Sequence, residues 1–549
     1  MLLRSIPYIL SAIAVGYAAP QVKLGKTTLV GRDITELKLD FFGGIPFAEP
    51  PLGKLRLKPP VLKTKLDEKT FDASNFGKGC FQQSSSVTEF SEDCLTINVY
   101  RPSGLKSNAK LPILFWTYGG GFDAGEASIY NGSAIVAQSV ARGTPLIYVN
   151  YNYRLGPLGF PQGQEADDRG ALNLALRDQL TALEWVQANI HFFGGDKSKV
   201  TVFGESAGAI MTAILFLNSP LDKLARAAIF ESGSAATPQE FNAERREIDW
   251  QNFVAGVPSC ASLATSGNTF DCIQAANSTE IFSGVINGLT KANEAFGYDP
   301  TFDGPNGLFP DIASKFLSSG HFARLPFITG TNLDEGAVFT PTTIQSAADI
   351  EAFLVAGYSP LAVSPAAFES TVAKLLELYP DDPALGSPFN TGNQTFGLNS
   401  NFKRAAALFG DLAFQGQRRA WIQAASRVGV KTFGYLFTQP QPNSGPFGVF
   451  HGSEVPYVYG APSDTSASSL RISSLMIDYW VSFATSLDPN DGRGIPRPHW
   501  AQYTPENQVI MQLNGDNTTL IPDNYRKEQI AFINSDPAVF HQRRSINKS

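Results

Sequence analysis

The feature that most constrains this chain is a glycine-flanked turn that carries a serine. The motif Gly204–Gly208 (GESAG) follows the β-branched run 199–203 and precedes small residues that can begin a helix. Such a turn needs glycines, because a Cβ beside the serine would collide with the strand or the helix. The strained turn holds the hydroxyl of Ser206 away from the backbone, which makes it a candidate nucleophile. The pattern alone is weak evidence, so its position after a strand carries the signal.

The length and composition of the chain predict one large α/β unit. The 549 residues are 43% hydrophobic and include 40 Phe, enough for a large packed core. Strand-like and helix-like segments alternate from Leu29 to Leu487, and no Pro/Ser-rich or charge-rich linker interrupts them. We therefore expect a single domain over 19–549, with loop excursions.

The N-terminus is typical of a secretory signal peptide. Arg4 supplies the positive charge, and Ile6–Val15 is an apolar stretch too short to span a bilayer. The small residues Gly16 and Ala18 follow it, as a signal-peptidase cleavage site requires. We expect cleavage after residue 18 or one residue later; the alternative is a buried N-terminal strand. No second long apolar stretch follows. The mature chain should be secreted and extracellular, without a membrane span.

Cysteines and glycosylation motifs agree with export. Four cysteines form two close pairs in sequence, and the short loops favour the local bonds Cys80–Cys94 and Cys260–Cys272 over four free thiols. Acceptor motifs for N-glycosylation also suit a secretory route. A fifth motif, at Asn547, lies too near the end to count. The four expected glycosylation sites are Asn131, Asn277, Asn393 and Asn517.

The charge pattern argues against several classes of partner. The net charge is −7 and no basic stripe occurs, so nucleic-acid binding has no electrostatic basis. No histidines pair at metal-ligand spacing, and we expect neither a metal nor an organic cofactor. Low charge density with many aromatic residues instead suits an apolar small-molecule substrate; contact with a lipid surface and the oligomeric state stay open.

A serine nucleophile needs a base, and only five histidines are available. His191, His321, His499 and His541 occupy helix ends, a Pro/Arg-rich stretch or the polar tail. His451 instead follows the strand-like run 431–438 and a Gly- and Pro-rich loop. Loops beyond a strand's carboxyl end are where catalytic bases occur, so His451 is the predicted base.

The acid that orients the base should also follow a strand, between the serine and the histidine. The apolar run 325–330 is such a strand, and Asp334 and Glu335 follow it. Spacing alone cannot choose between these adjacent carboxylates. Asp334 could cap the next helix, which leaves Glu335 for the acid.

Three glycines supply the remaining part of a serine hydrolase site. The buried-strand run 111–118 ends in Gly119-Gly120-Gly121. Backbone N–H groups can surround an oxyanion only where side chains are absent. We expect donors from Gly120, Gly121 and Ala207, although a flexible glycine turn is the simpler alternative.

Together these residues resemble the type-B carboxylesterase/lipase family of the α/β-hydrolase superfamily, with most similarity to secreted fungal lipases and sterol esterases of the Candida rugosa type. The resemblance implies an α/β-hydrolase fold, a large mixed, mostly parallel sheet flanked by helices. It covers nearly the whole mature chain. The segments that carry it, besides the serine motif, are 43–51, 92–100, 152–154, 193–196, 402–404, 410–414 and 484–489.

The resemblance also assigns roles. The family's acid is a glutamate in Asp-Glu-Gly, which falls on Glu335, and its histidine motif matches 451–454. It supports both cysteine pairings. By position, four residues resemble those lining the family's acyl-binding tunnel, although such residues are more often part of a core. They are Val338, Phe339, Leu412 and Phe414.

The segment inside the first cysteine pair departs from the lipases. Lipases of this family carry a long amphipathic flap there, whereas only the mostly polar stretch 81–93 intervenes here. We expect an accessible site, weak interfacial activation and hydrolysis of bulky or long-chain apolar esters. Triacylglycerol, sterol, carotenoid and hydroxycinnamate esters all remain open as substrates. A non-catalytic adhesion protein on the same fold is the alternative from another class.

Overall fold

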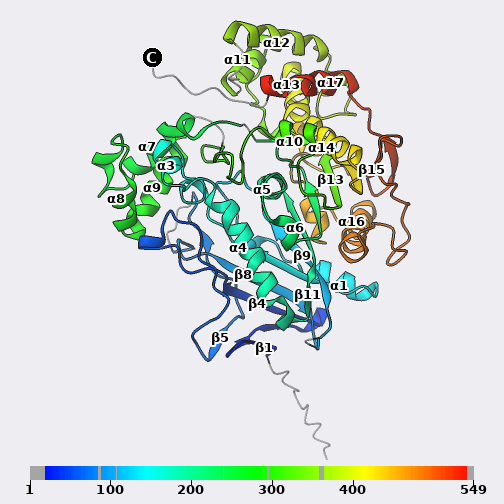
Figure 1. The fold of residues 1–549 in the computed structure, drawn as a ribbon. Helices are drawn as coiled ribbons and strands as arrows, with labels where there is room; N and C mark the ends of the chain where they lie inside the picture. The colour runs from blue at the N-terminus through cyan, green and yellow to red at the C-terminus, as the bar shows by residue number, and fades with distance from the viewer. Residues whose placement is uncertain are drawn as a thin grey trace, which may run out of the picture.

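An 11-stranded mixed sheet forms the centre of the molecule (Figure 1). The structure is a computed structural model that describes residues 19–83, 88–106, 108–238, 240–292, 296–357 and 364–540. The strands stand in the order β16-β15-β14-β13-β12-β11-β9-β10-β8-β4-β3. In chain order they are β3 (Arg32–Ile34), β4 (Leu39–Pro46), β8 (Thr96–Pro102), β9 (Leu111–Thr117), β10 (Ile147–Tyr151), β11 (Gly195–Glu205), β12 (Ala227–Glu231), β13 (Phe327–Asn332), β14 (Thr432–Phe437), β15 (Val509–Leu513) and β16 (Thr519–Pro522).

The middle of this sheet is parallel and its edges are antiparallel. Neighbouring strands from β10 through β9, β11, β12, β13 and β14 to β15 all pair in parallel. Strands β8, β4 and β3 on one side, and β16 on the other, pair antiparallel. Parallel strands present their carboxyl ends at one edge, and in such sheets that edge is where ligands bind. The predicted mostly parallel sheet is confirmed.

Helices cover both faces of the sheet, as buried parallel strands require. Helices α4 (Leu174–Asn189), α5 (Ala207–Leu215) and α14 (Gly416–Arg427) pack on one face, and α1 (Ser133–Ala141) and α16 (Ala467–Ser486) on the other (Figure 1). All six tryptophans are buried. In the described part of the chain, no helix combines the length and the apolar character that a bilayer span needs.

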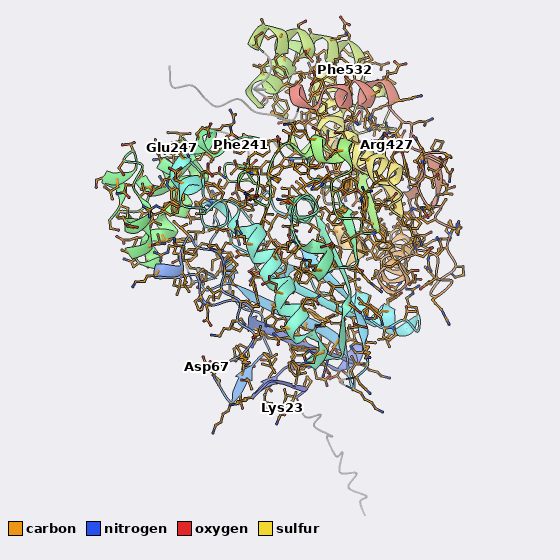
Figure 2. The ribbon with its side chains drawn as sticks, viewed as in Figure 1. Lys23, Asp67, Phe241, Glu247, Arg427 and Phe532 are labelled. Atoms are coloured by element: carbon orange, nitrogen blue, oxygen red, sulfur yellow. A yellow bond between two sulfur atoms is a disulfide. The ribbon has the colours of Figure 1, made fainter. Side chains whose placement is uncertain are left out.

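Three groups of elements extend from the central layers. A helical group at the top of Figure 1, which includes Phe532, has its own apolar cluster (Figure 2). The small sheet of β1, β2 and β5 lies at the opposite end of the molecule, near Lys23 and Asp67. The helical group contains α11 (Ala347–Gly357), α12 (Pro365–Leu378), α13 (Ser400–Gly410) and α17 (Lys527–Ser535). The small sheet contains β1 (Gln21–Leu24), β2 (Thr27–Val30) and β5 (Thr70–Asp72). The third group, at the left of Figure 1, holds α3 (Gln164–Asp168), α7 (Glu247–Ala255), α8 (Phe270–Ala275) and α9 (Ser278–Lys291).

Both predicted disulfides are formed, Cys80–Cys94 and Cys260–Cys272. The predicted strand at 199–203 lies within β11, and those at 111–118 and 431–438 correspond to β9 and β14. The strand predicted at 325–330 begins two residues late, at Phe327, because Pro326 has no N–H to donate to a neighbouring strand. The proposed signal peptide, residues 1–18, lies outside the described residues.

Candidate active site

Ser206 occupies the turn between β11 and α5 with a strained backbone. Its φ of 52° and ψ of −125° are rare for a residue with a side chain. The turn is held by its backbone, since the N–H of Ser206 donates to the carbonyl of Glu231 on β12 at 2.9 Å. The flanking glycines are required: a Cβ at Gly204 would lie 2.6 Å from the carbonyl oxygen of Thr117, and one at Gly208 would lie 2.0 Å from it. The side chain of Ser206 remains partly accessible.

His451 lies beside this turn, on the loop that follows β14. Its Nε2 is 3.2 Å from Oε1 of Glu205, the residue before the serine, and its side chain is only 9% exposed. Its Nδ1 is 2.6 Å from Oε2 of Glu335. The imidazole therefore bridges the serine turn and the carboxylate that follows β13.

Glu335 is the carboxylate that faces the imidazole, a choice that spacing could not make. Its side chain is buried, and its Oε1 accepts hydrogen bonds from Ser232 Oγ at 2.5 Å and from the N–H of Asn332 at 2.6 Å. Three hydrogen-bond partners on one buried carboxylate hold it in a fixed orientation. Such a group can keep Nδ1 protonated and leave Nε2 free to act as a base.

Asp334 points away from the imidazole. The prediction that it caps the next helix is wrong, because the short 3₁₀ helix Ala337–Phe339 begins after Gly336 and has no side-chain cap. The carboxylate of Asp334 instead accepts hydrogen bonds from the N–H groups of Phe389 and Val449. Neighbouring residues on this loop thus face opposite directions.

The glycine loop after β9 lies against the serine turn. A Cβ at Gly119 would be 2.8 Å from the Cβ of Ser206. Gly120 and Gly121 have φ values of +101° and +63°, a region that favours glycine. Ala207, the first residue of α5, is buried. The backbone N–H groups of Gly120, Gly121 and Ala207 therefore belong to two segments that meet at the serine, as an oxyanion-binding site requires.

Two of the four predicted tunnel residues contact the imidazole directly. The ring centroids of Phe339 and Phe414 lie 5.0 and 4.7 Å from that of His451. Val338 is 42% exposed, whereas Leu412 is buried in the apolar cluster of the upper helical group. Phe296, which the sequence did not single out, lies over the glycine loop: a Cβ at Gly121 would be 2.3 Å from its ring. The immediate surroundings of the imidazole are aromatic.

The remaining described histidines, His191, His321 and His499, are exposed and belong to other parts of the chain, and residue 541 lies outside the described residues. As predicted, a helix ends at the turn before His321: α10 is Ala313–Ser319, and Gly320 is left-handed. Helix α4 ends at Asn189, and a 3₁₀ turn then carries His191.

Several carboxyl groups shape the electrostatics around the imidazole. Burial alone lowers the pKa of His451, but the charges of Glu205 and Glu335 outweigh burial and raise that pKa to about 9. Burial, followed by the charges of neighbouring carboxylates, raises the pKa of Glu454, whose side chain accepts a hydrogen bond from Asn332. Burial also raises the pKa of Glu205, which the charge of His451 opposes. The site thus combines one buried imidazole with several carboxyl groups that compete for protons.

Sequence reasoning missed four residues of this site. Glu205 lies inside the predicted motif, so its place beside the base could have been suspected from the family pattern. Ser232 follows β12, Asn332 ends β13, and Glu454 is the last residue of the histidine motif 451–454. Their roles depend on contacts between strands far apart in the chain, which spacing does not reveal.

The comparisons with known proteins agree with this geometry. The sequence profile of the carboxylesterase family matches residues 18–533. The chain is 32% identical to lipase 2 of Geotrichum candidum, over 96% of this chain and 98% of that protein. It is 34% identical to secreted lipase 1 of Botryotinia fuckeliana (strain B05.10), over 94% of this chain and 93% of that protein. Diutina rugosa lipase 2 is also similar, at 31% identity, which confirms the predicted resemblance to fungal lipases of this type.

A solved structure shares the fold. The crystal structure of Aspergillus niger EstA superimposes with a TM-score of 0.82 at 26% identity, over 95% of this chain and 99% of that one. The α/β-hydrolase fold predicted from the sequence is thereby confirmed. With the family profile spanning nearly all of the described residues, the chain belongs to the carboxylesterase family and is a carboxylic ester hydrolase.

Proposed function

We propose that this enzyme cleaves apolar esters through an acyl-enzyme formed on Ser206. His451 Nε2 takes the proton of Ser206 Oγ as the oxygen attacks the ester carbonyl carbon. The carbon–oxygen bond to the alcohol then breaks, and the alcohol leaves with the proton from His451. Water attacks the acyl-enzyme, its proton passes through His451 to Ser206, and the acid is released. Glu335 holds the tautomer and stabilises the imidazolium.

The observation that carries this proposal is the position of the imidazole. Its Nδ1 meets the buried Glu335 at 2.6 Å, while its Nε2 lies at the residue preceding Ser206. This orientation supports Nε2 as the atom that serves the serine hydroxyl. The glycine loop, packed against the Cβ of Ser206, supports Gly120, Gly121 and Ala207 as donors to the oxyanion.

The substrate we infer is an ester with a bulky or long apolar group. Phe339 and Phe414 contact the imidazole, and Phe296 adds a third ring 6.1 Å from Phe339. Rings beside the reacting centre favour apolar groups because apolar surface leaves water on binding. Val338, with its exposed side chain, and Leu412, deeper in the helical group, would extend the acyl-binding surface.

The short segment inside the first disulfide supports weak interfacial activation. Gln82 pairs with the backbone of Gly125 through two hydrogen bonds of 3.0 Å, and the ring of Phe81 packs 5.0 Å from that of Phe282. The start of the segment is thus fixed to the body of the protein. A large hydrophobic flap that opens at an oil surface has no counterpart in such a segment; residues 84–87 of it lie outside the described part.

We further propose that the chain is secreted as a single-domain glycoprotein. Residues 1–18 would be the signal peptide and 19–549 the mature domain. Relatives named as secreted lipases support this route. The four glycosylation motifs support it too, because each acceptor side chain is exposed: Asn131, Asn277, Asn393 and Asn517.

The decisive test is Ser206→Ala. The variant should lose kcat by a factor on the order of 10⁶, by comparison with other serine hydrolases, and should no longer react with a fluorophosphonate probe. Its melting temperature should stay close to that of the wild type, since only one hydroxyl is removed. Hydrolysis of a chromogenic ester at a near wild-type rate would rule out the proposed nucleophile.

A panel of esters tests which class of substrate the enzyme prefers and whether an interface activates it. Triacylglycerol, sterol, carotenoid and hydroxycinnamate esters should be compared, each as dissolved and as emulsified substrate where possible. We expect the rate to rise smoothly with substrate concentration through the solubility limit. A sharp increase at the limit would contradict the weak interfacial activation inferred from the short segment.

A further inference from the structure

We propose that Asp334 is a positioning residue: its carboxylate holds the loop that carries His451 where the imidazole meets Glu335. This inference rests on the catalytic triad proposed above and adds to it a residue that touches neither substrate nor imidazole. It concerns the part of the site that local sequence cannot position, a histidine on a loop.

The carboxylate of Asp334 joins two loops. Its Oδ2 accepts a hydrogen bond from the N–H of Val449 at 2.8 Å, two residues before the base. Its Oδ1 accepts from the N–H of Phe389 at 2.8 Å and from Ser387 Oγ at 2.9 Å. The N–H of Asp334 itself donates to the carbonyl of Val449 at 3.0 Å. The side chain is 2% exposed, so no water competes for these bonds.

The histidine loop approaches this carboxylate unusually closely. Gly448 has a φ of +58°, and a Cβ there would lie 2.4 Å from Oδ2 of Asp334 and 2.7 Å from the Cβ of Pro388. The carboxylate and the 387–389 loop thus leave no room for a side chain at position 448. A shift of Asp334 would be transmitted directly to the backbone that leads into His451.

A second contact comes from the same strand end. Asn332 Nδ2 donates to the carbonyl of Phe450 at 2.8 Å. Asn332 therefore contacts residue 450, Asp334 contacts residue 449, and Glu335 contacts residue 451. These contacts form a strip in which the two loops run side by side, with a parallel β-bridge between Asp334 and Phe450. Asp334 is the only one of the three that also ties this strip to the 387–389 loop, among the described contacts.

A carboxylate suits this position because every partner is a donor. An asparagine side chain has one acceptor oxygen and one NH₂ group, so its NH₂ would face an N–H of either Val449 or Phe389. The loop would move to relieve that contact. Misplacing a catalytic group by about 1 Å can cost on the order of 10²-fold in rate.

Glu165 provides a matched control. Its buried carboxylate also accepts from two backbone N–H groups and one hydroxyl: those of Thr269 and Phe270, and Thr269 Oγ1. It belongs to α3, in the group of helices at the left of Figure 1, and these hydrogen-bond partners lie at residues 269 and 270, outside the serine, Glu335 and histidine segments. Glu165→Gln, which also removes an ion pair with Arg169 (3.3 Å), should therefore show what losing such a set of contacts away from the triad does to stability.

The experiment compares Asp334→Asn, Glu165→Gln and wild type with a dissolved chromogenic ester, well below the melting temperature of each. We expect Asp334→Asn to lower kcat by about 10- to 100-fold with KM within about twofold. We also expect the far-downfield proton resonance of His451 Nδ1–H to weaken or move upfield. Glu165→Gln should lower the melting temperature while keeping both kcat and that resonance.

A second variant covers the case in which Asp334→Asn does not fold. Gly448→Ala presses on Oδ2 of the same carboxylate from the histidine loop and should lower kcat in the same way. Wild-type kcat and an unchanged resonance in whichever variant folds would overturn the inference. Loss of activity in Ser206→Ala together with that result would leave the proposed triad intact, whereas an active Ser206→Ala would remove the basis of both.

Discussion

The serine turn and the histidine loop are held in place by different kinds of contact. At the turn, the neighbours are backbone: Gly204 and Gly208 both lie against the carbonyl of Thr117, and the N–H of Ser206 is bonded to β12. At the loop, the neighbours are side chains: Asn332, Asp334 and Glu335 reach across from β13. One half of the site is built by close backbone packing and the other by buried polar groups.

This difference predicts different sensitivities. Backbone packing leaves no room for an added carbon, so the turn should tolerate almost no increase in side-chain size. The histidine loop depends mainly on hydrogen bonds, so outside Gly448, where an added Cβ would press on Asp334, it should tolerate changes in volume better than changes in polarity. The substitutions below test this contrast.

Gly208→Ala should have the largest effect. The added Cβ would lie 2.0 Å from the carbonyl oxygen of Thr117 and 2.6 Å from that of Tyr118, both backbone atoms at the end of β9. We expect little soluble protein, or a loss of more than about 4 kcal/mol of stability, measured by denaturant unfolding and fluorophosphonate labelling. Gly143→Ala is the control, because nothing lies within 4 Å of its Cβ position and only the φ of +77° is unfavourable. If Gly208→Ala labelled and unfolded like Gly143→Ala, the backbone account of the turn would be wrong.

Ser232→Ala should have an intermediate effect, on activity rather than folding. It removes the hydroxyl that donates to Oε1 of Glu335 at 2.5 Å. A hydrogen bond to a charged group contributes roughly 1.5–3 kcal/mol, so kcat should fall about 10- to 150-fold with little change in KM. Ser473→Ala removes a buried hydroxyl that donates to the carbonyl of Tyr457 and should keep wild-type kcat. Equal kcat values for the two variants would show that the polar support of Glu335 is dispensable.

Glu205→Gln should have the smallest effect, visible mainly in the pH dependence. The negative charge of Glu205 favours the protonated imidazole and raises the pKa of His451 against the effect of burial. Removing that charge lowers the pKa of His451, so the neutral base persists to lower pH. The acidic limb of the kcat/KM profile should therefore move to lower pH, with little change in rate on the alkaline side. If the acidic limb stayed in place or moved to higher pH, the charge of Glu205 would not raise the pKa of His451.

Most of the fold could be predicted because it depends on local patterns. The apolar runs that became β9, β11 and β14 are bounded by glycines and polar turns, and the GESAG motif marks the junction of β11 with α5. The disulfides follow from short cysteine spacing. The boundary of β13 was less predictable, since one proline displaced its start.

The candidate site also has features that local sequence patterns predict and features that depend on contacts between distant segments. The sequence by itself determined a serine at a strained turn, glycines wherever a backbone approaches closely, and one histidine after a suitable strand. The family resemblance pointed to Glu335, but only the tertiary structure accounts for it, because there Glu335 faces the imidazole while Asp334 turns toward Val449 and Phe389. The physical reason is that two adjacent side chains on a loop have equal access to either direction, and the donors that separate them come from segments more than 50 residues away.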